Sequence, residues 1–183
     1  LLKFRGEDTR PYAYPHEVSK LFDDLWKHPR TLEILELLIG SKVRGLQTWM
    51  YFKPPGEFGR DIHQNIFYTH VNKGDIINAS LAIDGSNKES GCLYAYIGSH
   101  VEWCLPIEKD DERIKTNPKD WRNERGKPCA IPGEWVDGVW TEKYKKKYLP
   151  MNSGEIIFLH SHVLHGSDDN KSSDRWRRVF LCG

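Results

Sequence analysis

Two histidine-bearing segments suggest a metal site in this chain. His63 and Asn65 lie two residues apart, and a later segment that ends at His165 is followed by Ser167 and Arg177. Two imidazoles and one carboxylate on a β scaffold form the facial triad that holds non-heme Fe(II) and leaves positions open for a cosubstrate and dioxygen. Asn65 stands where the carboxylate is expected. An amide offers a neutral oxygen of weaker donor strength, so the sequence predicts a weakened iron site.

Strand geometry decides which of these side chains can meet. In an extended strand, residues two apart project to the same face, so His63 and Asn65 can reach one ion while Gln64 points away. Asp61 shares this parity and is an alternative carboxylate, although a surface or loop-capping role is simpler. The second imidazole can come from any of three histidines near the end of a later strand: His160, His162 and His165. Spacing does not choose among them, and hydrogen-bonded structural histidines are the alternative to a metal site.

The composition fits one globular domain and a small, neutral partner. The 183 residues carry 27 basic and 26 acidic side chains, so no strong field directs the chain to nucleic acid or to an anionic membrane. The basic run 143–148 is interpreted as a solvated face, with phosphate binding as the alternative. The four cysteines form no C-x-x-C pair and indicate reduced thiols in a cytoplasmic protein. No apolar stretch reaches transmembrane length, so we expect a soluble protein.

The hydrophobic pattern predicts helices first and strands afterwards. A helical spacing with one buried stripe links Val18, Leu21, Phe22, Leu25 and Trp26, and a second helix runs from a cap at Thr31 to Gly40, so helices occupy about 15–40. Short apolar runs predict strands at 46–52, 76–83, 92–97, 156–159 and 179–181. This order indicates a mostly β, α+β domain built as a jelly roll.

A long insertion is expected at about 101–150. Charged clusters there alternate with Trp103, Trp121, Trp135 and Trp140, without strand or helix periodicity. Long loops of this kind in compact domains are often lids or binding loops, so the tryptophans are candidates for covering a substrate pocket. The alternative is a small hydrophobic cluster that anchors the loop.

Several short segments between Gln47 and Leu181 follow one another in a fixed order. They are Phe52-Lys53-Pro54-Pro55-Gly56, His63-Gln64-Asn65 with Tyr68, Leu81-Ala82-Ile83-Asp84, Ser90-Gly91-Cys92-Leu93, Ile97-Gly98-Ser99-His100, Gly154-Glu155 through His160, His165-Gly166-Ser167, Asn170, Ser172 or Ser173, and Arg177. Together they resemble the phytanoyl-CoA dioxygenase (PhyH) family of Fe(II)/2-oxoglutarate oxygenases. The resemblance implies a cupin-like double-stranded β-helix.

The resemblance also implies a role for each site residue. His63 and His165 would be the iron ligands, with Asn65 in the place of the third. Arg177 would pair with the distal carboxylate of 2-oxoglutarate, Ser167 would hydrogen-bond that carboxylate, and Gln47 would line the cosubstrate site. An arginine suits this task because its guanidinium binds a carboxylate through two parallel hydrogen bonds. Two neighbouring arginines are alternatives for this role. Arg175 lies on the same face of the strand as Arg177 and is the main competitor, whereas Arg178 faces the other way.

These inferences predict an Fe(II)/2-oxoglutarate-dependent dioxygenase that hydroxylates a small organic substrate. Its partners would be 2-oxoglutarate, dioxygen and that substrate. The main alternative is a non-catalytic PhyH-like binding protein that has lost stable iron through Asn65. A halogenase-like variant, in which a halide takes the vacant ligand position, ranks below both, because Asn65 is bulkier than the small residue used there. Ser80, where relatives often carry tryptophan, would reshape the pocket.

Overall fold

The structure is a computed structural model, and it describes residues 11–67, 76–101 and 142–183. Helices α1 (Pro15–Val18), α2 (Lys20–Trp26) and α3 (Pro29–Ile39) come first; the strands are β1 (Tyr12–Ala13), β2 (Thr48–Lys53), β3 (Arg60–His63), β4 (Ile77–Ala82), β5 (Leu93–Tyr96), β6 (Lys146–Leu149), β7 (Ile156–His160), β8 (His165–Ser167) and β9 (Arg177–Cys182). Two 3-10 helices, η1 (Asn65–Phe67) and η2 (Ser99–Val101), complete the described elements.

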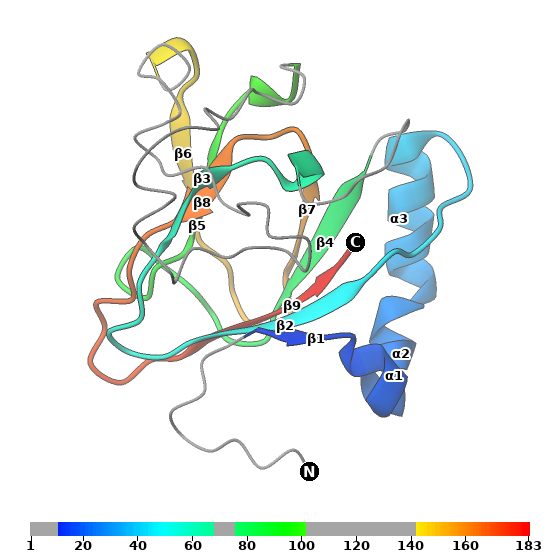
Figure 1. The fold of residues 1–183 in the computed structure, drawn as a ribbon, viewed down its shortest axis with the longest axis horizontal. Helices are drawn as coiled ribbons and strands as arrows, with labels where there is room; N and C mark the ends of the chain where they lie inside the picture. Colours follow the sequence, from blue (N-terminus) through cyan, green and yellow to red (C-terminus); the bar gives the residue numbers. More distant parts are fainter. Residues whose placement is uncertain (1–10, 68–75, 102–141) are drawn as a thin grey trace, which may run out of the picture.

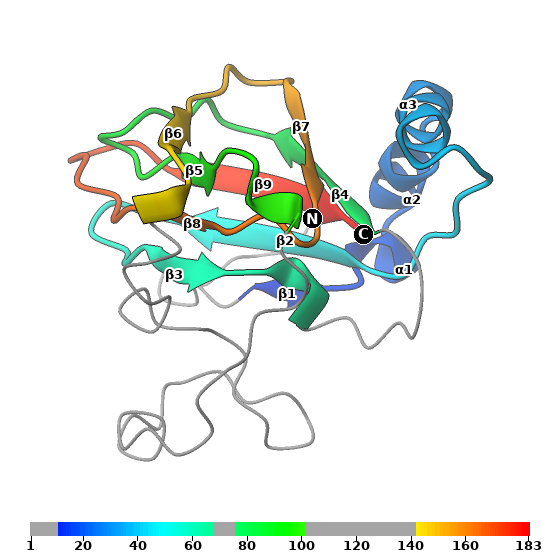
Figure 2. The ribbon, with the colours of Figure 1, turned by 90° about the horizontal axis from the view of Figure 1, so that it is seen from above.

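The strands form two antiparallel sheets. One has the order β1-β2-β9-β4-β7 and the other the order β3-β8-β5-β6. Except for β1-β2 and β5-β6, the neighbours are strands that do not follow one another in the chain. Figure 1 shows the three helices beside the five-stranded sheet, on the side away from β5 and β6, and the view from above in Figure 2 agrees. This arrangement confirms the predicted mostly β jelly roll with flanking helices.

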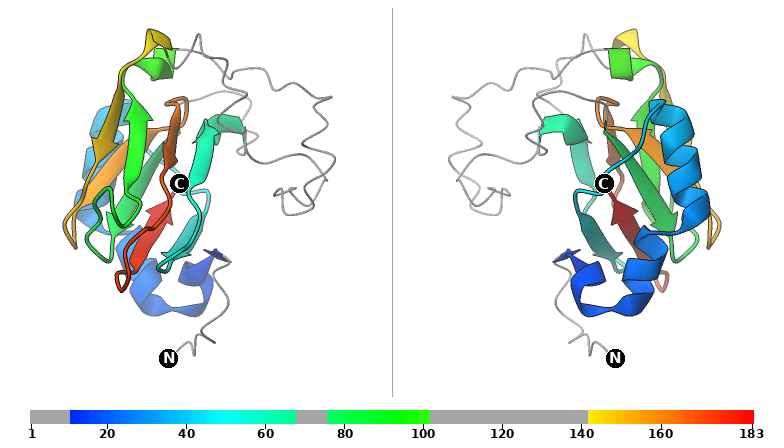
Figure 3. Two further views of the ribbon diagram at one scale, coloured as in Figure 1. Left: turned by 90° about the vertical axis from the view of Figure 1, so that its left-hand side faces the viewer. Right: turned by 90° about the vertical axis from the view of Figure 1, so that its right-hand side faces the viewer.

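The five-stranded sheet separates two environments. Met50 and Phe52 of β2 and Phe180 of β9 belong to a hydrophobic cluster that includes Phe22, Leu25 and Trp26 of α2. The right-hand view of Figure 3 looks at these helices from outside. Because side chains alternate along a strand, the other face of β2 carries Tyr51 and Lys53, which therefore point towards the four-stranded sheet.

The first helix differs from its prediction. The chain breaks at Ser19, whose φ of −143° and ψ of 117° are extended, so the predicted helix is two short ones. Phe22, Leu25 and Trp26 pack on the core, but Val18 and Leu21 are exposed. The predicted buried stripe is therefore wrong for its first two members: Val18 belongs to α1, before the break, and Leu21 is an exposed residue of α2.

The second helix ends where expected but begins earlier. It starts at Pro29, with His28 rather than Thr31 in the capping position, since a proline fits the first turn of a helix where its missing N–H is not needed. At the other end Gly40 has a φ of 77°, the left-handed conformation that glycine adopts without strain.

The five predicted strands appear as β2, β4, β5, β7 and β9, whereas β1, β3, β6 and β8 were not predicted as strand runs. β6 lies inside the predicted insertion 101–150, so the insertion ends earlier than expected. Its lysines hid the strand, although lysine is common on edge strands such as this one. The four tryptophans of the insertion lie outside the described residues.

Two further observations concern the whole described chain. Within residues 11–67, 76–101 and 142–183, no helix has both the length and the apolarity needed to cross a membrane. Cys92 and Cys182 are buried free thiols. Burial raises the pKa of the Cys182 thiol to about 12, so this side chain stays protonated at neutral pH.

Candidate metal centre and cosubstrate site

His63 and His165 lie side by side on neighbouring strands. His63 ends β3 and His165 begins β8, the two are direct partners in the antiparallel register, and their ring centroids are 4.3 Å apart. The register shifts between Arg60 and His63, because three steps along β3 correspond to two along β8, from Ser167 to His165. Such a bulge re-aims side chains. Here it lets Arg60 and His63 lie opposite Ser167 and His165 despite their odd spacing.

The second histidine is held in one tautomer. The Nδ1 atom of His165 lies 2.8 Å from the carbonyl oxygen of Val163. A carbonyl only accepts, so Nδ1 carries the proton and Nε2 keeps its lone pair for a cation. Burial, and then the neighbouring His63, lower the pKa of His165 to about 3. The imidazole is therefore neutral at physiological pH, as a metal ligand must be.

The third predicted ligand follows the strand instead of lying on it. The chain leaves β3 after His63, and Asn65 is the first residue of η1. Gln64 is fully buried, with its amide nitrogen donating to the carbonyl oxygen of His162 at 2.8 Å. Asp61 lies on β3, but its side chain lies outside what the structure describes. In the described part of the chain, no group of three histidine, cysteine, aspartate or glutamate side chains could hold a metal.

The donor set that the sequence predicts is two imidazoles and an amide, and the structure brings the two imidazoles together. The pair of histidines fits a divalent transition metal, because neutral imidazole nitrogens are common ligands for iron. The amide oxygen of Asn65 fits less well than a carboxylate, since it brings no negative charge. The candidate residues therefore suit Fe(II) with reduced affinity.

Ser167 lies two residues beyond His165 and is surrounded by donors. Its hydroxyl oxygen accepts from Lys53 Nζ at 2.8 Å and from the backbone amide of Arg60 at 3.1 Å. Lys53 Nζ also donates to the carbonyl oxygen of Asp168 at 2.8 Å. These hydrogen bonds link β2 of one sheet to β8 of the other, so the two sheets are in direct contact here.

The three neighbouring arginines have different environments. Arg178 makes two hydrogen bonds of 2.7 Å to the carboxylate of Asp84, and Arg175 forms an ion pair with Glu89, both at the surface. Arg177 lies opposite Lys53 in the register of β9 and β2. Among the described residues it has no ion-pair partner. Burial lowers the pKa of Arg177 to about 10, which still leaves the guanidinium charged. A buried charge without a counter-ion is costly, and a bound anion would remove that cost.

Asn170 orders the loop between β8 and β9, which leads to Arg177. The Asn170 amide donates to the carbonyl oxygens of Lys53 at 3.0 Å and Arg175 at 2.7 Å, and its oxygen accepts from the amide and hydroxyl groups of Ser172. Ser172 is buried and Ser173 is exposed, so Ser172 is the residue that completes this network.

Comparisons with known proteins show the family of this chain. The family model for phytanoyl-CoA dioxygenase (PhyH) matches residues 2–179. The chain belongs to this family. The resemblance read from its motifs is therefore confirmed.

Among relatives of the PhyH chain, a probable alpha-ketoglutarate-dependent hypophosphite dioxygenase of Stutzerimonas stutzeri is 28% identical over 188 residues, which cover 99% of this chain and 59% of that protein. The peroxisomal phytanoyl-CoA dioxygenase of Homo sapiens is 23% identical over 159 residues, covering 84% of this chain and 43% of that protein. The chain thus spans about half the length of these relatives.

Solved structures show the same fold. EctD from S. alaskensis, crystallised with 2-oxoglutarate and 5-hydroxyectoine, matches with a TM-score of 0.72 at 17% identity, over 94% of this chain and 55% of that one. The non-heme alpha ketoglutarate dependent carbocyclase SnoK from nogalamycin biosynthesis matches with a TM-score of 0.69 at 19% identity, over 94% and 61%.

Gln47 lies away from the other site residues of this PhyH chain. It precedes β2, and its backbone pairs with Gly183, whereas Lys53 and Arg177 pair at the other end of the same two strands. Six residues of strand separate Gln47 from Lys53, a distance of about 20 Å. Gln47 and Arg177 therefore lie near opposite ends of this strand pair. The expected place of Gln47 in the lining of the cosubstrate site stays a prediction.

The remaining candidate histidines gather elsewhere. The His160 ring lies 5.0 Å from that of His162 and 5.9 Å from that of His100, measured between centroids. His160 Nδ1 also accepts the backbone amide of His162 at 3.2 Å. Ser80 is buried on β4. Of the three histidines that the sequence left open, His165 is the one that the structure places against His63.

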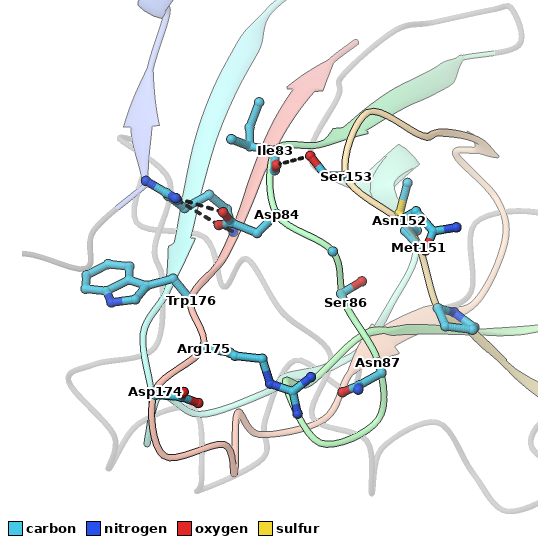
Figure 4. A pocket seen from close by; sticks show the side chains of 13 residues that line it. Ile83, Asp84, Ser86, Asn87, Met151, Asn152, Ser153, Asp174, Arg175 and Trp176 are labelled. Carbon is cyan, nitrogen blue, oxygen red and sulfur yellow. Dashed lines mark hydrogen bonds and ion pairs between the residues drawn. The ribbon is translucent and has the colours of Figure 1, made fainter.

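One open pocket in the described part of the chain has no histidine in its lining. It measures about 840 Å³ and is lined by residues 83–87, 150–153, 174–176 and 178. Figure 4 shows Arg175 and Trp176 on one side and Ser86 and Asn87 on another, with the Asp84 carboxylate bound to Arg178. Because its guanidinium groups already have carboxylate partners, this pocket does not offer the cation that the interior offers at Arg177.

Sequence reasoning missed three groups at this site. Lys53 stood inside a quoted motif without a role, the Val163 carbonyl was not considered, and Arg60 with Tyr51 was overlooked. The Arg60 guanidinium carbon lies 5.9 Å from the centre of the Tyr51 ring. Only the alternation of Tyr51 and Lys53 along β2 could have indicated that both face inwards.

Proposed function

We propose that this chain is the catalytic core of an Fe(II)/2-oxoglutarate-dependent dioxygenase that hydroxylates a small organic substrate. The observation that carries the proposal is the pairing of His63 with a neutral, tautomer-fixed His165, in a fold that also holds the partly buried, charged guanidinium of Arg177. A cation and a dianionic keto acid could then bind side by side. Relatives whose names include alpha-ketoglutarate-dependent dioxygenase support the same reaction class.

In this proposal each residue has one task. His63, His165 and the amide oxygen of Asn65 would hold Fe(II), which supplies the chemistry of dioxygen activation when it is bound. Arg177 would bind the distal carboxylate of 2-oxoglutarate, and Ser167 would donate its hydroxyl hydrogen to the same carboxylate. The small substrate and dioxygen are the remaining partners. Nucleic acid and membranes have no part in it, and the buried free thiols suit a cytoplasmic protein.

One residue favours a second candidate function. Asn65 brings no negative charge to a site that normally includes a carboxylate, so a PhyH-like binding protein without stable iron is the alternative. The two functions differ in what iron does. An oxygenase binds Fe(II) and 2-oxoglutarate together, whereas a binding protein keeps its pocket and takes up no iron.

An anaerobic titration of the chain with Fe(II) and 2-oxoglutarate separates them. Chelation of 2-oxoglutarate by Fe(II) gives a visible charge-transfer band, and the proposal expects this band in the unmodified chain at elevated Fe(II) concentration. Asn65→Asp should raise the iron affinity by about tenfold or more, because a charged oxygen replaces a neutral one. His165→Ala should abolish the band in both backgrounds.

Succinate release under air completes the test. If neither the unmodified chain nor Asn65→Asp shows the band, and both remain folded, the oxygenase proposal is wrong. If only Asn65→Asp shows it, the unmodified chain is the binding protein. Arg177→Met is the matched control, since it should weaken 2-oxoglutarate binding while leaving iron uptake in place.

A further inference from the structure

Lys53 is the buried group of this interior that the proposed function does not use. Its ammonium group lies between the two sheets, donating to Ser167 Oγ and to the carbonyl oxygen of Asp168, both at 2.8 Å. Its side chain is almost fully buried, and it forms no ion pair among the described residues. The buried Lys53 lies opposite the partly buried Arg177, and this pairing is repulsive, since like charges directly across a strand pair destabilise a sheet.

The hydrogen bonds of Ser167 show what Lys53 can do. A hydroxyl group has two lone pairs and one hydrogen. Lys53 Nζ and the amide of Arg60 take both lone pairs, so the hydroxyl can act only as a donor to anything else. No acceptor for that hydrogen occurs among the described residues.

We propose that Lys53 is a positioning residue of the cosubstrate site, which fixes Ser167 as a hydrogen-bond donor towards the carboxylate bound by Arg177. Lys53 also adds a second positive charge beside that carboxylate. The inference rests on the proposed function, because it assumes that 2-oxoglutarate is the anion that Arg177 binds. The role of Lys53 follows from its hydrogen bonds to Ser167 and Asp168 and does not depend on a metal ion.

The charge on Lys53 is adjustable. Burial first, and then the positive charges of Arg177 on β9 and Arg60 on β3, lower the pKa of Lys53 to about 7, against smaller opposite effects of Asp169 and Glu57. A protonated lysine only donates, so it keeps Ser167 in the donor role. A neutral amine has a lone pair and can accept the Ser167 hydrogen, which turns that hydrogen away from the carboxylate.

A pH dependence of cosubstrate binding follows. The protonated form predominates below pH 7 and the neutral form above it, so 2-oxoglutarate should bind more tightly at pH 6.5 than at pH 8.5. We expect about a tenfold difference in Kd, the usual effect of a hydrogen bond that involves a charged group. Binding of the dianion will in turn raise the pKa of Lys53, and proton uptake should accompany binding at pH 7.5.

The experiment measures 2-oxoglutarate binding by calorimetry to the whole chain supplied with Mn(II), which does not turn over. Lys53→Met removes charge and donors while keeping the length of the side chain. It should weaken binding about tenfold at pH 6.5 and little at pH 8.5. Lys53→Arg keeps a permanent charge and should remove the pH dependence while preserving affinity. Lys171→Met, at an exposed lysine of the β8–β9 loop, is the matched control and should change nothing.

A double-mutant cycle tests whether Lys53 acts through Ser167. Ser167→Ala and Lys53→Met should be non-additive, because either change alone removes the same oriented donor. Additive effects, or a pH profile that is identical in the unmodified chain and in Lys53→Arg, overturn the inference while leaving the proposed function standing. An unmodified chain that binds no 2-oxoglutarate with Mn(II) at any pH overturns both. Thermal unfolding of each variant shows that it is folded.

Discussion

Lys53→Met should stabilise the protein in the absence of cosubstrate. The pKa of Lys53 falls from 10.5 to about 7 on folding, chiefly because of burial. A shift of this size makes the protonated folded state less stable by about 5 kcal/mol below pH 7. Methionine removes this penalty but leaves the Ser167 and Asp168 oxygens without their donor, which costs about 1–3 kcal/mol. The net gain should be about 2 kcal/mol at pH 6.5.

The size of the effect changes with pH in a defined way. The unfolded lysine binds its proton below pH 10.5, and the folded one does so only below about 7. Stability is therefore lost as the pH falls from 10.5 to 7 and is then constant. Between pH 7 and 8.5 this group alone should raise the unfolding free energy of the unmodified protein by about 1–2 kcal/mol. The Lys53→Met variant lacks this rise.

Urea unfolding at pH 6.5, 7 and 8.5, followed by tryptophan fluorescence, measures both quantities. The difference between the two proteins should shrink as the pH rises, since the unmodified lysine has by then lost its charge. Groups with raised pKa values, such as the Cys182 thiol, titrate equally in both proteins and cancel. Parallel stability curves, or a variant less stable than the unmodified protein at pH 6.5, would refute the claim that a strained buried ammonium group lies here.

Three further outcomes follow from the structure. In Gly166→Ala, the new Cβ would lie 2.7 Å from the Arg60 carbonyl oxygen and 2.5 Å from Tyr94 Oη, so β3 and β8 must separate. Thermal unfolding should show that the free energy of unfolding falls by about 1–3 kcal/mol, and titration with Co(II) should show weaker metal binding. Asn170→Ala removes four hydrogen bonds, three of them buried and one part-buried. It should cost about 3 kcal/mol in urea unfolding, with weaker 2-oxoglutarate binding. The folded His165 stays neutral down to about pH 3, whereas an unfolded histidine protonates near pH 6.5. The free energy of unfolding of the metal-free protein should therefore fall by about 2 kcal/mol between pH 7 and 5. Urea unfolding of His165→Gln over the same pH range should lack this fall.

The long, apolar strands were predictable because their signal is local. β2, with the sequence Thr48–Lys53, and β4, Ile77–Ala82, are runs of β-favouring or small residues that read as strands by themselves. β3 and β8 are short and polar, and they become strands only because each pairs with a distant segment. Sequence patterns report local preference, so strands created by tertiary pairing were missed.

The candidate site shows the same division. His63, His165 and Arg177 were found through motif order, which is readable in one dimension. The reason that His63 faces His165 is the bulge in β3, and a strict alternation along that strand gives no hint of it. Arg177 and Arg175 have equal parity and equal chemistry, and only the ion pair between Arg175 and Glu89 tells them apart. Counter-ions from distant segments are invisible in the sequence.

The charge balance of this interior links the metal site to the cosubstrate site. The proposed ligands, two imidazoles and an amide, bring no negative charge, so a dication bound to them would keep its full charge. Arg177 is a partly buried positive group and Lys53 a buried one in the same fold. A dianionic keto acid would offset both kinds of charge at once, and so it should raise metal affinity more in this chain than in a protein whose third ligand is a carboxylate. Asn65→Asp supplies part of that negative charge permanently. It should therefore strengthen metal binding and, at the same time, reduce how much 2-oxoglutarate strengthens it further.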